Sequence, residues 1–145
     1  VQGAFKYDNQ VLLEQYIDGL EFTVSVLQGR ALPSIRMSTP HNFYDYAAKY
    51  QDDTTVYHCP SGLSQDREAE LAALSLRAFN ALSCSGWGRI DVMQAADGTF
   101  YLLEANTVPG MTEKSLVPKA AKVAGLSFDE LTLEILATSL TEHEA

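Results

Sequence analysis

Sulfur and positive charge are both scarce in this sequence of 145 residues. Two cysteines, Cys59 and Cys84, are too few for a disulfide framework, so we interpret both as reduced thiols of a cytosolic protein. Lysine and arginine together number 10 against 19 aspartates and glutamates, which gives a formal net charge of -9 at pH 7. An acidic surface repels nucleic acid and anionic membranes, and we therefore expect neither as a partner.

Long apolar runs, internal repeats and low-complexity segments are lacking as well. No run approaches the roughly 20 apolar residues of a membrane-spanning helix, and there is no secretory signal. Hydrophobic residues still make up 46% of the chain, which is enough for one domain with a core. The sequence opens on Val1-Gln2-Gly3 without a starting methionine, and we interpret this opening as the continuation of a longer protein.

The first third of the chain carries strand patterns. Residues 11–17 are apolar and β-prone, and they lead into Asp18-Gly19, a hairpin turn signal. Alternation over 21–27 and an apolar run over 31–37 predict two further strands. Residues 41–60 are aromatic, polar and irregular, and they predict a long ordered loop of the kind that often carries function.

Three helices are predicted in the second half. The clearest spans 66–82, a shorter one begins near Pro118 and ends at Gly125, and a capping box of Ser127 and Glu130 predicts a last one. Strands first and helices later indicate an α+β fold rather than a doubly wound sheet. The first helix is expected to bury one face, formed by Leu71, Leu74, Ala78 and Leu82.

A hairpin over 89–105 holds the candidate chemistry. If Asp97-Gly98 forms a two-residue turn, or if residues 96–99 form a four-residue loop, Asp91 lies directly opposite Glu104. Opposed side chains on one sheet face lie about 4.5–5.5 Å apart at Cβ. Two carboxylates at that spacing repel each other unless a cation or a shared proton lies between them.

The same register places Arg89 opposite Asn106, on the face of the two carboxylates. Oxygen ligands from Asp91, Glu104 and Asn106 are of the kind that Mg²⁺ prefers, and Arg89 could neutralise charge in a transition state. The alternative is a solvated polar face with an ordinary ion pair, and a register error of one residue would remove the argument. The opposite face is expected to be core, formed by Ile90, Val92, Leu103 and Ala105.

A loop with a Pro-Gly pair follows the hairpin. The backbone N–H at Gly110 can approach a ligand oxygen closely, although a plain turn explains the same residues. Ser115 and Leu116 stand where a helix begins, and free N–H groups there favour a carboxylate. The alternative is that Ser115 is only an N-cap.

Several segments resemble the D-alanine–D-alanine ligases, a family of carboxylate–amine ligases in the ATP-grasp superfamily. The resemblance extends over nearly the whole chain, in order and with family-like spacing. Small departures are Gln15, where members often carry a basic residue, and Glu113 and Lys114, where small or polar residues are common. The segments that carry the resemblance are 21–24, 43–50, 86–93, 101–107 and 109–112.

The resemblance implies a role for each residue of the polar face. Asp91, Glu104 and Asn106 would hold two Mg²⁺ (or Mn²⁺) ions against the phosphates of ATP. Arg89 would stabilise the transferring phosphate, and together with the backbone N–H of Gly110 it would hold the oxyanion of a tetrahedral intermediate.

The resemblance also implies binding residues for ATP and D-alanine. Ser115 and Leu116 would bind the carboxylate of the second D-alanine, and Glu21 the ribose hydroxyls. Tyr50 would lie on a lid loop over the active site, and its presence favours the dipeptide product. The remaining nucleotide contacts would come from Glu14, Gln15, Tyr16 and Ile17 at the adenine, Phe43 near it and Lys49 near the γ-phosphate.

The implied reaction joins two D-alanines through an acyl phosphate, in the cytoplasm, for peptidoglycan synthesis. Residues 1–14 would end the ATP-grasp central domain, and residues 15–145 would form the C-terminal domain, mainly an antiparallel sheet packed with helices. We expect the chain to be inactive alone, and the full-length form to be a homodimer. The alternatives are an ATP-grasp ligase with a different acceptor and a non-catalytic nucleotide-binding remnant.

Overall fold

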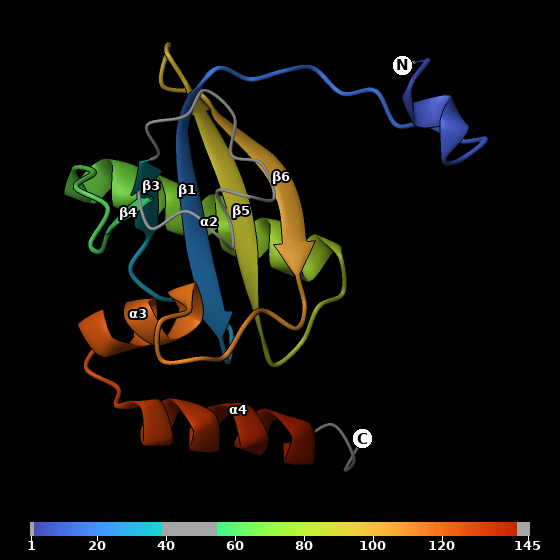
Figure 1. Cartoon of the computed structure of the whole chain (residues 1–145). Helices are drawn as coiled ribbons and strands as arrows, with labels where there is room; N and C mark the ends of the chain where they lie inside the picture. The colour runs from blue at the N-terminus through green and yellow to red at the C-terminus, as the bar shows by residue number, and fades with distance from the viewer. Residues whose placement is uncertain (1, 39–54, 142–145) are drawn as a thin grey trace.

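The computed structural model describes residues 2–38 and 55–141, and it confirms an α+β fold with an antiparallel sheet (Figure 1). The sheet has six strands in the order β4-β3-β1-β5-β6, with β2 paired to β1. The strands are β1 Gly19–Leu27, β2 Arg30–Ala31, β3 Ile35–Ser38, β4 Val56–His58, β5 Trp87–Ala95 and β6 Phe100–Asn106. The helices are the 3₁₀ turn η1 Ala4–Lys6 and the α-helices α2 Gln65–Ala81, α3 Leu116–Val123 and α4 Phe128–Thr141.

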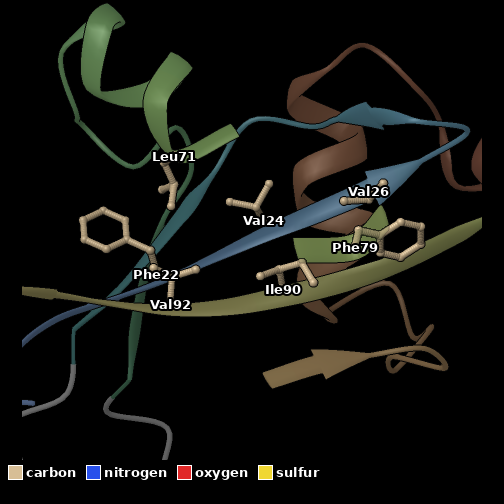
Figure 2. Close-up of a cluster of buried hydrophobic side chains, with 7 residues drawn as sticks. All are labelled: Phe22, Val24, Val26, Leu71, Phe79, Ile90 and Val92. Carbon is tan, nitrogen blue, oxygen red and sulfur yellow. The ribbon is translucent and has the colours of Figure 1, made fainter. Parts of the chain in front are cut away.

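Both faces of the sheet bury apolar side chains, because helices pack on each. On the face of α2, alternate residues of β1 and β5 meet the helix in one core (Figure 2), formed by Phe22, Val24, Val26, Leu71, Phe79, Ile90 and Val92. On the other face, the end of β1 packs against α3 and α4 in a second core, formed by Leu27, Leu32, Ile35, Val117, Ala120, Ala121 and Leu131.

Helix α2 lies where the sequence predicts a helix, but its buried face is turned from the predicted one. Leu71, Ser75 and Phe79 are its buried residues, whereas Leu82 follows the helix and is 63% exposed. The large ring of Phe79 decides the rotation, because it lies against the backbone of Gly88. A Cβ at Gly88 would lie only 2.8 Å from that ring, so the contact requires glycine.

The two C-terminal helices follow their predicted signals. Helix α3 carries Pro118 in its first turn, and Gly125 follows its end with φ of 92°. The capping box of α4 is confirmed, since the Ser127 hydroxyl accepts from the Glu130 N–H at 3.2 Å and the Glu130 carboxylate accepts from the Ser127 N–H at 2.8 Å. The hydrogen bond from the Ser127 N–H, and a second one at 2.7 Å from the Ser127 hydroxyl to the same carboxylate, favour its ionised form and lower the pKa of Glu130.

The predicted strand over 11–17 and the turn at Asp18-Gly19 are wrong. This segment has no regular secondary structure, and Gly19 is already the first residue of β1. Leu12 and Leu13 are about four-fifths exposed on an arm that extends away from the sheet (Figure 1). A strand needs a partner, and none of the described residues pairs with this arm. Gly19 is required for close approach instead, because its Cβ would lie 2.0 Å from the carbonyl oxygen of Gln94.

The predicted strand over 31–37 is divided, with β2 and β3 separated at residues 32–34. Glu68 of α2 stabilises the segment between β2 and β3, since its carboxylate accepts from the N–H and the hydroxyl of Ser34, each at 2.7 Å. The same carboxylate accepts from the Ser61 hydroxyl at 3.0 Å. The predicted loop over 41–60 is corrected at 56–58, which form β4; its residues 41–54 lie outside the described residues.

The turn of the β5–β6 hairpin has neither of the two predicted lengths. The Ala95 N–H donates to the carbonyl oxygen of Thr99 at 2.9 Å, so the loop has three residues and ends on Gly98 with φ of 87°. A bulge between Asp91 and Val92 then shifts the pairing by one residue, because Val92 pairs with Leu102 and Leu103 is left without a partner on β5.

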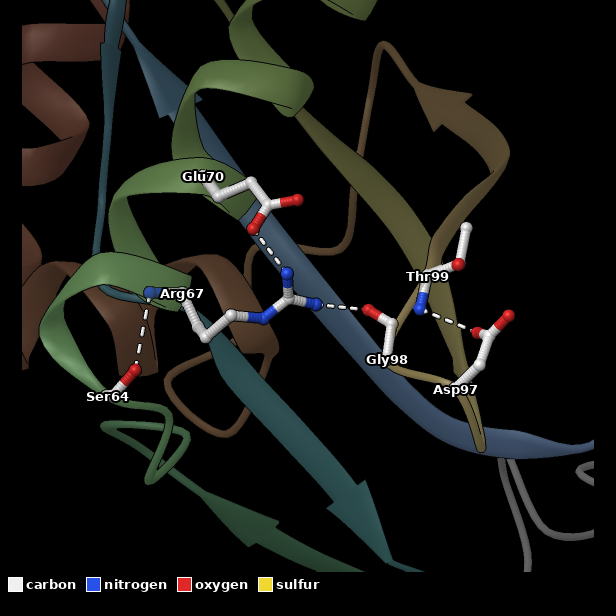
Figure 3. Close-up of polar contacts among 6 residues, drawn as sticks. All are labelled: Ser64, Arg67, Glu70, Asp97, Gly98 and Thr99. Atoms are coloured by element: carbon white, nitrogen blue, oxygen red, sulfur yellow. Dashed lines mark hydrogen bonds and ion pairs between the residues drawn. The ribbon is translucent and has the colours of Figure 1, made fainter.

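Arg67 of α2 ties the helix to this turn (Figure 3). Its guanidinium donates to the Gly98 carbonyl oxygen, pairs with Glu70, and lies 4.3 Å over the centre of the Phe100 ring. Inside the turn, the Thr99 N–H donates to the Asp97 carboxylate at 2.9 Å, which lowers the pKa of Asp97.

We predict that Arg67→Met lowers the free energy of unfolding by about 1–2 kcal/mol, because it removes a hydrogen bond and a cation–π contact while keeping an apolar stem. Urea unfolding measures the change. Arg77→Met, at an exposed position of the same helix, is the matched control. Equal effects of the two substitutions would show that Arg67 contributes no specific contact.

Candidate metal and nucleotide site

Strands β5 and β6 place the predicted polar residues side by side. Asp91 pairs with Glu104 and Arg89 with Asn106, as predicted. Cross-strand partners share a sheet face, so these four side chains lie opposite the α2 core. The register of the facing carboxylates is therefore confirmed, although the turn that was expected to produce it is not the one observed.

Hydrogen bonds join the four side chains into one cluster. Arg89 donates to both oxygens of Asp91, from Nε to Oδ1 and from Nη2 to Oδ2, each at 2.8 Å. Both residues are buried, with exposed fractions of 9% and 6%, so the pair is not the solvated ion pair of the alternative interpretation. The Asn106 amide nitrogen donates to Asp91 Oδ2 at 3.0 Å and to Glu104 Oε1 at 3.2 Å.

The composition of this cluster suits a divalent cation. Asp91, Glu104 and Arg89 sum to one negative charge, and the oxygens of Asp91, Glu104 and Asn106 are hard donors. Across the described parts of the chain, no three His, Cys, Asp or Glu side chains converge as a metal group. The candidate set contains two carboxylates and one amide, so phosphate oxygens or water would have to complete the coordination of an ion.

Two buried hydroxyl groups flank the ion pair from β1. Thr23 is the cross-strand partner of Asp91, and Ser25 is the partner of Arg89. Each residue is 1% exposed, and within the described structure neither Thr23 Oγ1 nor Ser25 Oγ has a hydrogen-bond partner. Buried polar atoms are nearly always paired, so these two hydroxyls beside the ion pair are exceptions.

A cleft of about 490 Å³ adjoins the cluster. Its volume lies in the range typical of small-molecule sites. It brings together described residues predicted for adenine, for ribose and for metal, although neither Tyr16, which is 64% exposed, nor Asn106 lines it. The lining residues are Glu14, Gln15, Ile17, Glu21, Asp91, Tyr101, Leu102, Leu103 and Glu104.

The wall of this cleft on β6 was not predicted from the sequence. Tyr101, Leu102 and Leu103 line it, whereas Leu103 was expected in the core and is 50% exposed instead. The bulge is the reason, because Leu103 is its extra residue and does not follow the regular alternation of side chains between the two sheet faces. Three successive apolar residues before Glu104 were the only signal available in the sequence.

Gly110 and Ser115 contact each other away from the cleft lining. A Cβ at Gly110 would lie 3.2 Å from Ser115 Oγ, and that hydroxyl accepts from the Thr112 N–H at 3.1 Å. Ser115 is the N-cap residue of α3, but its side chain makes no capping hydrogen bond to the helix and instead bonds to the preceding loop. The Leu116 side chain packs against the second core.

Three predicted residues, Phe43, Lys49 and Tyr50, lie outside the described residues. Within the described part of the chain, no helix is long and apolar enough to cross a membrane.

Comparisons with known proteins identify the family. The model of the D-ala D-ala ligase C-terminus matches residues 1–137. The chain therefore belongs to the C-terminal domains of D-alanine–D-alanine ligases, and its α+β sheet is part of the ATP-grasp fold. It is 66% identical over 139 residues to the D-alanine–D-alanine ligase of Pseudoalteromonas atlantica, covering 96% of this chain and 44% of that protein. The ligase of Idiomarina loihiensis is 59% identical over 140 residues, covering 97% of this chain and 45% of that protein.

Solved structures give the same result. The D-alanine–D-alanine ligase of Bacillus anthracis complexed with ATP superposes with a TM-score of 0.82 at 38% identity, covering 99% of this chain and 48% of the other. The chain thus spans a little under half the length of the relatives it matches.

We predict opposite effects of removing two buried serine hydroxyls. Ser25→Ala deletes an unpaired hydroxyl, so the free energy of unfolding should stay within about 0.5 kcal/mol of the parent or rise. Ser34→Ala deletes a hydroxyl that donates to the Glu68 carboxylate at 2.7 Å, and it should cost about 1.5–3 kcal/mol. Both serines are 1% exposed, which makes them a matched pair in urea unfolding. A clear loss of stability in Ser25→Ala would mean that its hydroxyl has a bound partner in solution.

Proposed function

We propose that this chain is the C-terminal catalytic portion of a D-alanine–D-alanine ligase, which consumes ATP to form D-alanyl-D-alanine for peptidoglycan. One observation carries the proposal. In a chain that is 66% identical to such a ligase, a single cleft joins Glu14, Gln15, Ile17 and Glu21 to the facing carboxylates Asp91 and Glu104.

The cleft suits the base and ribose of ATP. Leu102, Leu103 and Ile17 offer apolar surface to an adenine ring, and the Glu21 carboxylate can accept hydrogen bonds from ribose hydroxyls. Backbone groups of residues 14–17 can recognise the edge of the base. Phe43 and Lys49 keep their predicted roles near the adenine and the γ-phosphate as part of this proposal.

Asp91, Glu104 and Asn106 are the residues that would hold Mg²⁺ or Mn²⁺. When bound, such ions offset the negative charge of the ATP phosphates during phosphoryl transfer. The net negative charge of the cluster and the presence of Asp91 and Glu104 in the lining of the cleft support this assignment.

The reaction proceeds in two steps in this proposal. The carboxylate of one D-alanine attacks the γ-phosphorus of ATP, which gives an acyl phosphate and ADP. The neutral amine of a second D-alanine then attacks the acyl carbon, the C–O bond breaks with its electrons passing to the departing phosphate, and the proton lost from the amine nitrogen is accepted by that phosphate. Arg89 donates hydrogen bonds to the phosphoryl group in transfer, and Arg89 with the N–H of Gly110 stabilises the tetrahedral oxyanion.

The acceptor D-alanine is assigned to the start of α3. Ser115 is the N-cap and Leu116 the first residue of an eight-residue helix, whose dipole favours a carboxylate at this end. The Ser115 N–H donates to the Thr112 carbonyl oxygen at 2.8 Å, so in this proposal the Leu116 N–H is the backbone donor to the carboxylate. Tyr50 on the proposed lid loop favours an amino acid over a hydroxy acid as acceptor. A D-alanine–D-alanine ligase is therefore preferred to an ATP-grasp ligase with another acceptor.

Residues 1–14 are proposed to end the central domain of the ligase, and residues 15–145 to form its C-terminal domain. The exposed side chains of Phe5, Tyr7, Leu12 and Leu13 support this division, because an apolar arm of this kind needs a covering surface. The relatives extend over more than twice the matched length, and that additional part would supply the surface and the rest of the ATP cleft. Homodimer formation by the longer protein remains a prediction.

The decisive experiment is D-alanine-dependent phosphate release from ATP by a chimaera. It joins the N-terminal part of the Pseudoalteromonas atlantica ligase to this chain, and the chain alone is assayed beside it. We expect an active chimaera, an inactive chain, and a loss on the order of 100-fold in Glu104→Gln because a metal-binding carboxylate is removed. Glu113→Gln, an exposed loop residue, is the matched control and should leave the rate unchanged.

Each other outcome has a distinct meaning. Activity of the chain alone would contradict the proposed division of the active site. A folded but inactive chimaera would favour the non-catalytic remnant or a different acceptor.

A further inference from the structure

The orientation of the Asn106 amide conflicts with its proposed use as a cation ligand. Its nitrogen donates to Asp91 Oδ2 at 3.0 Å and to Glu104 Oε1 at 3.2 Å. An amide nitrogen donates two hydrogen bonds and accepts none, whereas both carboxylates only accept. The NH₂ group is thus the only part of Asn106 that can serve both carboxylates, and the amide oxygen is directed elsewhere.

The oxygens of Asp91 are already engaged in the same arrangement. Oδ1 accepts from Arg89 Nε, and Oδ2 accepts from both Arg89 Nη2 and Asn106 Nδ2. We call this the self-paired arrangement of Arg89, Asp91, Glu104 and Asn106. It offsets the repulsion of two carboxylates on paired strand positions by means of one guanidinium and one amide.

We propose that Asn106 alternates between two roles in the metal site. In the self-paired arrangement its NH₂ group bridges the two carboxylates, and in the other its amide has turned by half a rotation to present the oxygen to a divalent cation. This inference rests on the metal site of the proposed function. It assigns Asn106 a positioning role besides that of a ligand, because the bridging amide holds the carboxylates at the spacing that a cation needs.

Two consequences follow for cation binding. A cation must displace the two amide hydrogen bonds, so the affinity is about tenfold weaker than that of a site with the amide already turned. A monovalent ion gains less from the two carboxylates than a divalent ion does, so Na⁺ should leave the self-paired arrangement in place.

The side-chain NH₂ signals of Asn106 report the turn directly. In NMR spectra of the ¹⁵N-labelled chain, with resonances assigned by through-bond correlation experiments, we expect Mg²⁺ to shift the Asn106 NH₂ resonances away from their hydrogen-bonded positions. The backbone signals of Asp91 and Glu104 should move over the same titration. The NH₂ signals of Asn80, exposed on α2, are the internal control, and NaCl of equal ionic strength is the control for screening.

The outcomes separate this inference from the metal site itself. If the signals of Asp91 and Glu104 respond to Mg²⁺ while the Asn106 NH₂ signals stay in place, the metal site stands and the turn is wrong. If none of these signals responds to Mg²⁺, with or without ADP, the metal site fails and the inference fails with it.

A substitution provides a second measurement. Asn106→Asp keeps an oxygen and removes both donors, so its melting temperature in metal-free buffer should fall below that of the parent. Mg²⁺ should then raise that temperature by more than it raises the parent's, since no amide has to turn. Asn80→Asp adds the same charge at an exposed position, and an equal response of the two variants would overturn the inference.

Discussion

Asp91 and Glu104 face each other because two departures from regular pairing in the β5–β6 hairpin occur together. The loop of three residues ending at Gly98 sets one register near the turn, and the bulge at Leu103 shifts it by one residue before the pair is reached. Glu104 is thereby kept on the face of Asp91, with Leu103 added to the strand between Leu102 and Glu104. Everything proposed for the metal site depends on this register, because a slip of one residue would turn Glu104 towards the α2 core.

The hairpin is held in this register from both sides of the sheet. On the α2 side, Arg67 fixes the turn, and Phe79 lies on Gly88 at the opposite end of β5. On the other side, the Asn106 amide of β6 donates to Asp91 of β5, and the buried Arg89 on β5 pairs with the same carboxylate. A buried ion pair is weak evidence for stability, since desolvation offsets most of its Coulomb energy, but loss of one partner leaves an unpaired buried charge. Its contribution here is therefore to geometry more than to the free energy of folding.

How far the sequence predicts this structure depends on the range of the interaction concerned. Local signals were sufficient for helix α2, for the Ser127–Glu130 capping box and for the glycine after α3. The pairing of Asp91 with Glu104 was also predicted, although from a turn of two or four residues and without the bulge. Local pattern failed for residues 11–17, because β-prone side chains do not form a strand where no partner strand is available.

Contacts between segments that are distant in the sequence could not be predicted from local patterns. The positions of Thr23 and Ser25 beside Asp91 and Arg89 follow from the pairing of β1 with β5, which no local pattern specifies. The apolar wall of the cleft depends on the same kind of information, since Leu103 lines the cleft only because of the bulge. The rotation of α2 was missed for a related reason, as it is set by the fit of Phe79 against Gly88.

The bulge has a consequence for how such a site can evolve. Leu103 has no partner on β5. A chain with Leu103 deleted would therefore form the hairpin without a bulge, and Glu104 would still face Asp91. The residue is an insertion that adds to the wall of the cleft without moving the carboxylates. Natural variation at this one position can therefore reshape what the cleft accepts while the chemistry beside it is inherited unchanged.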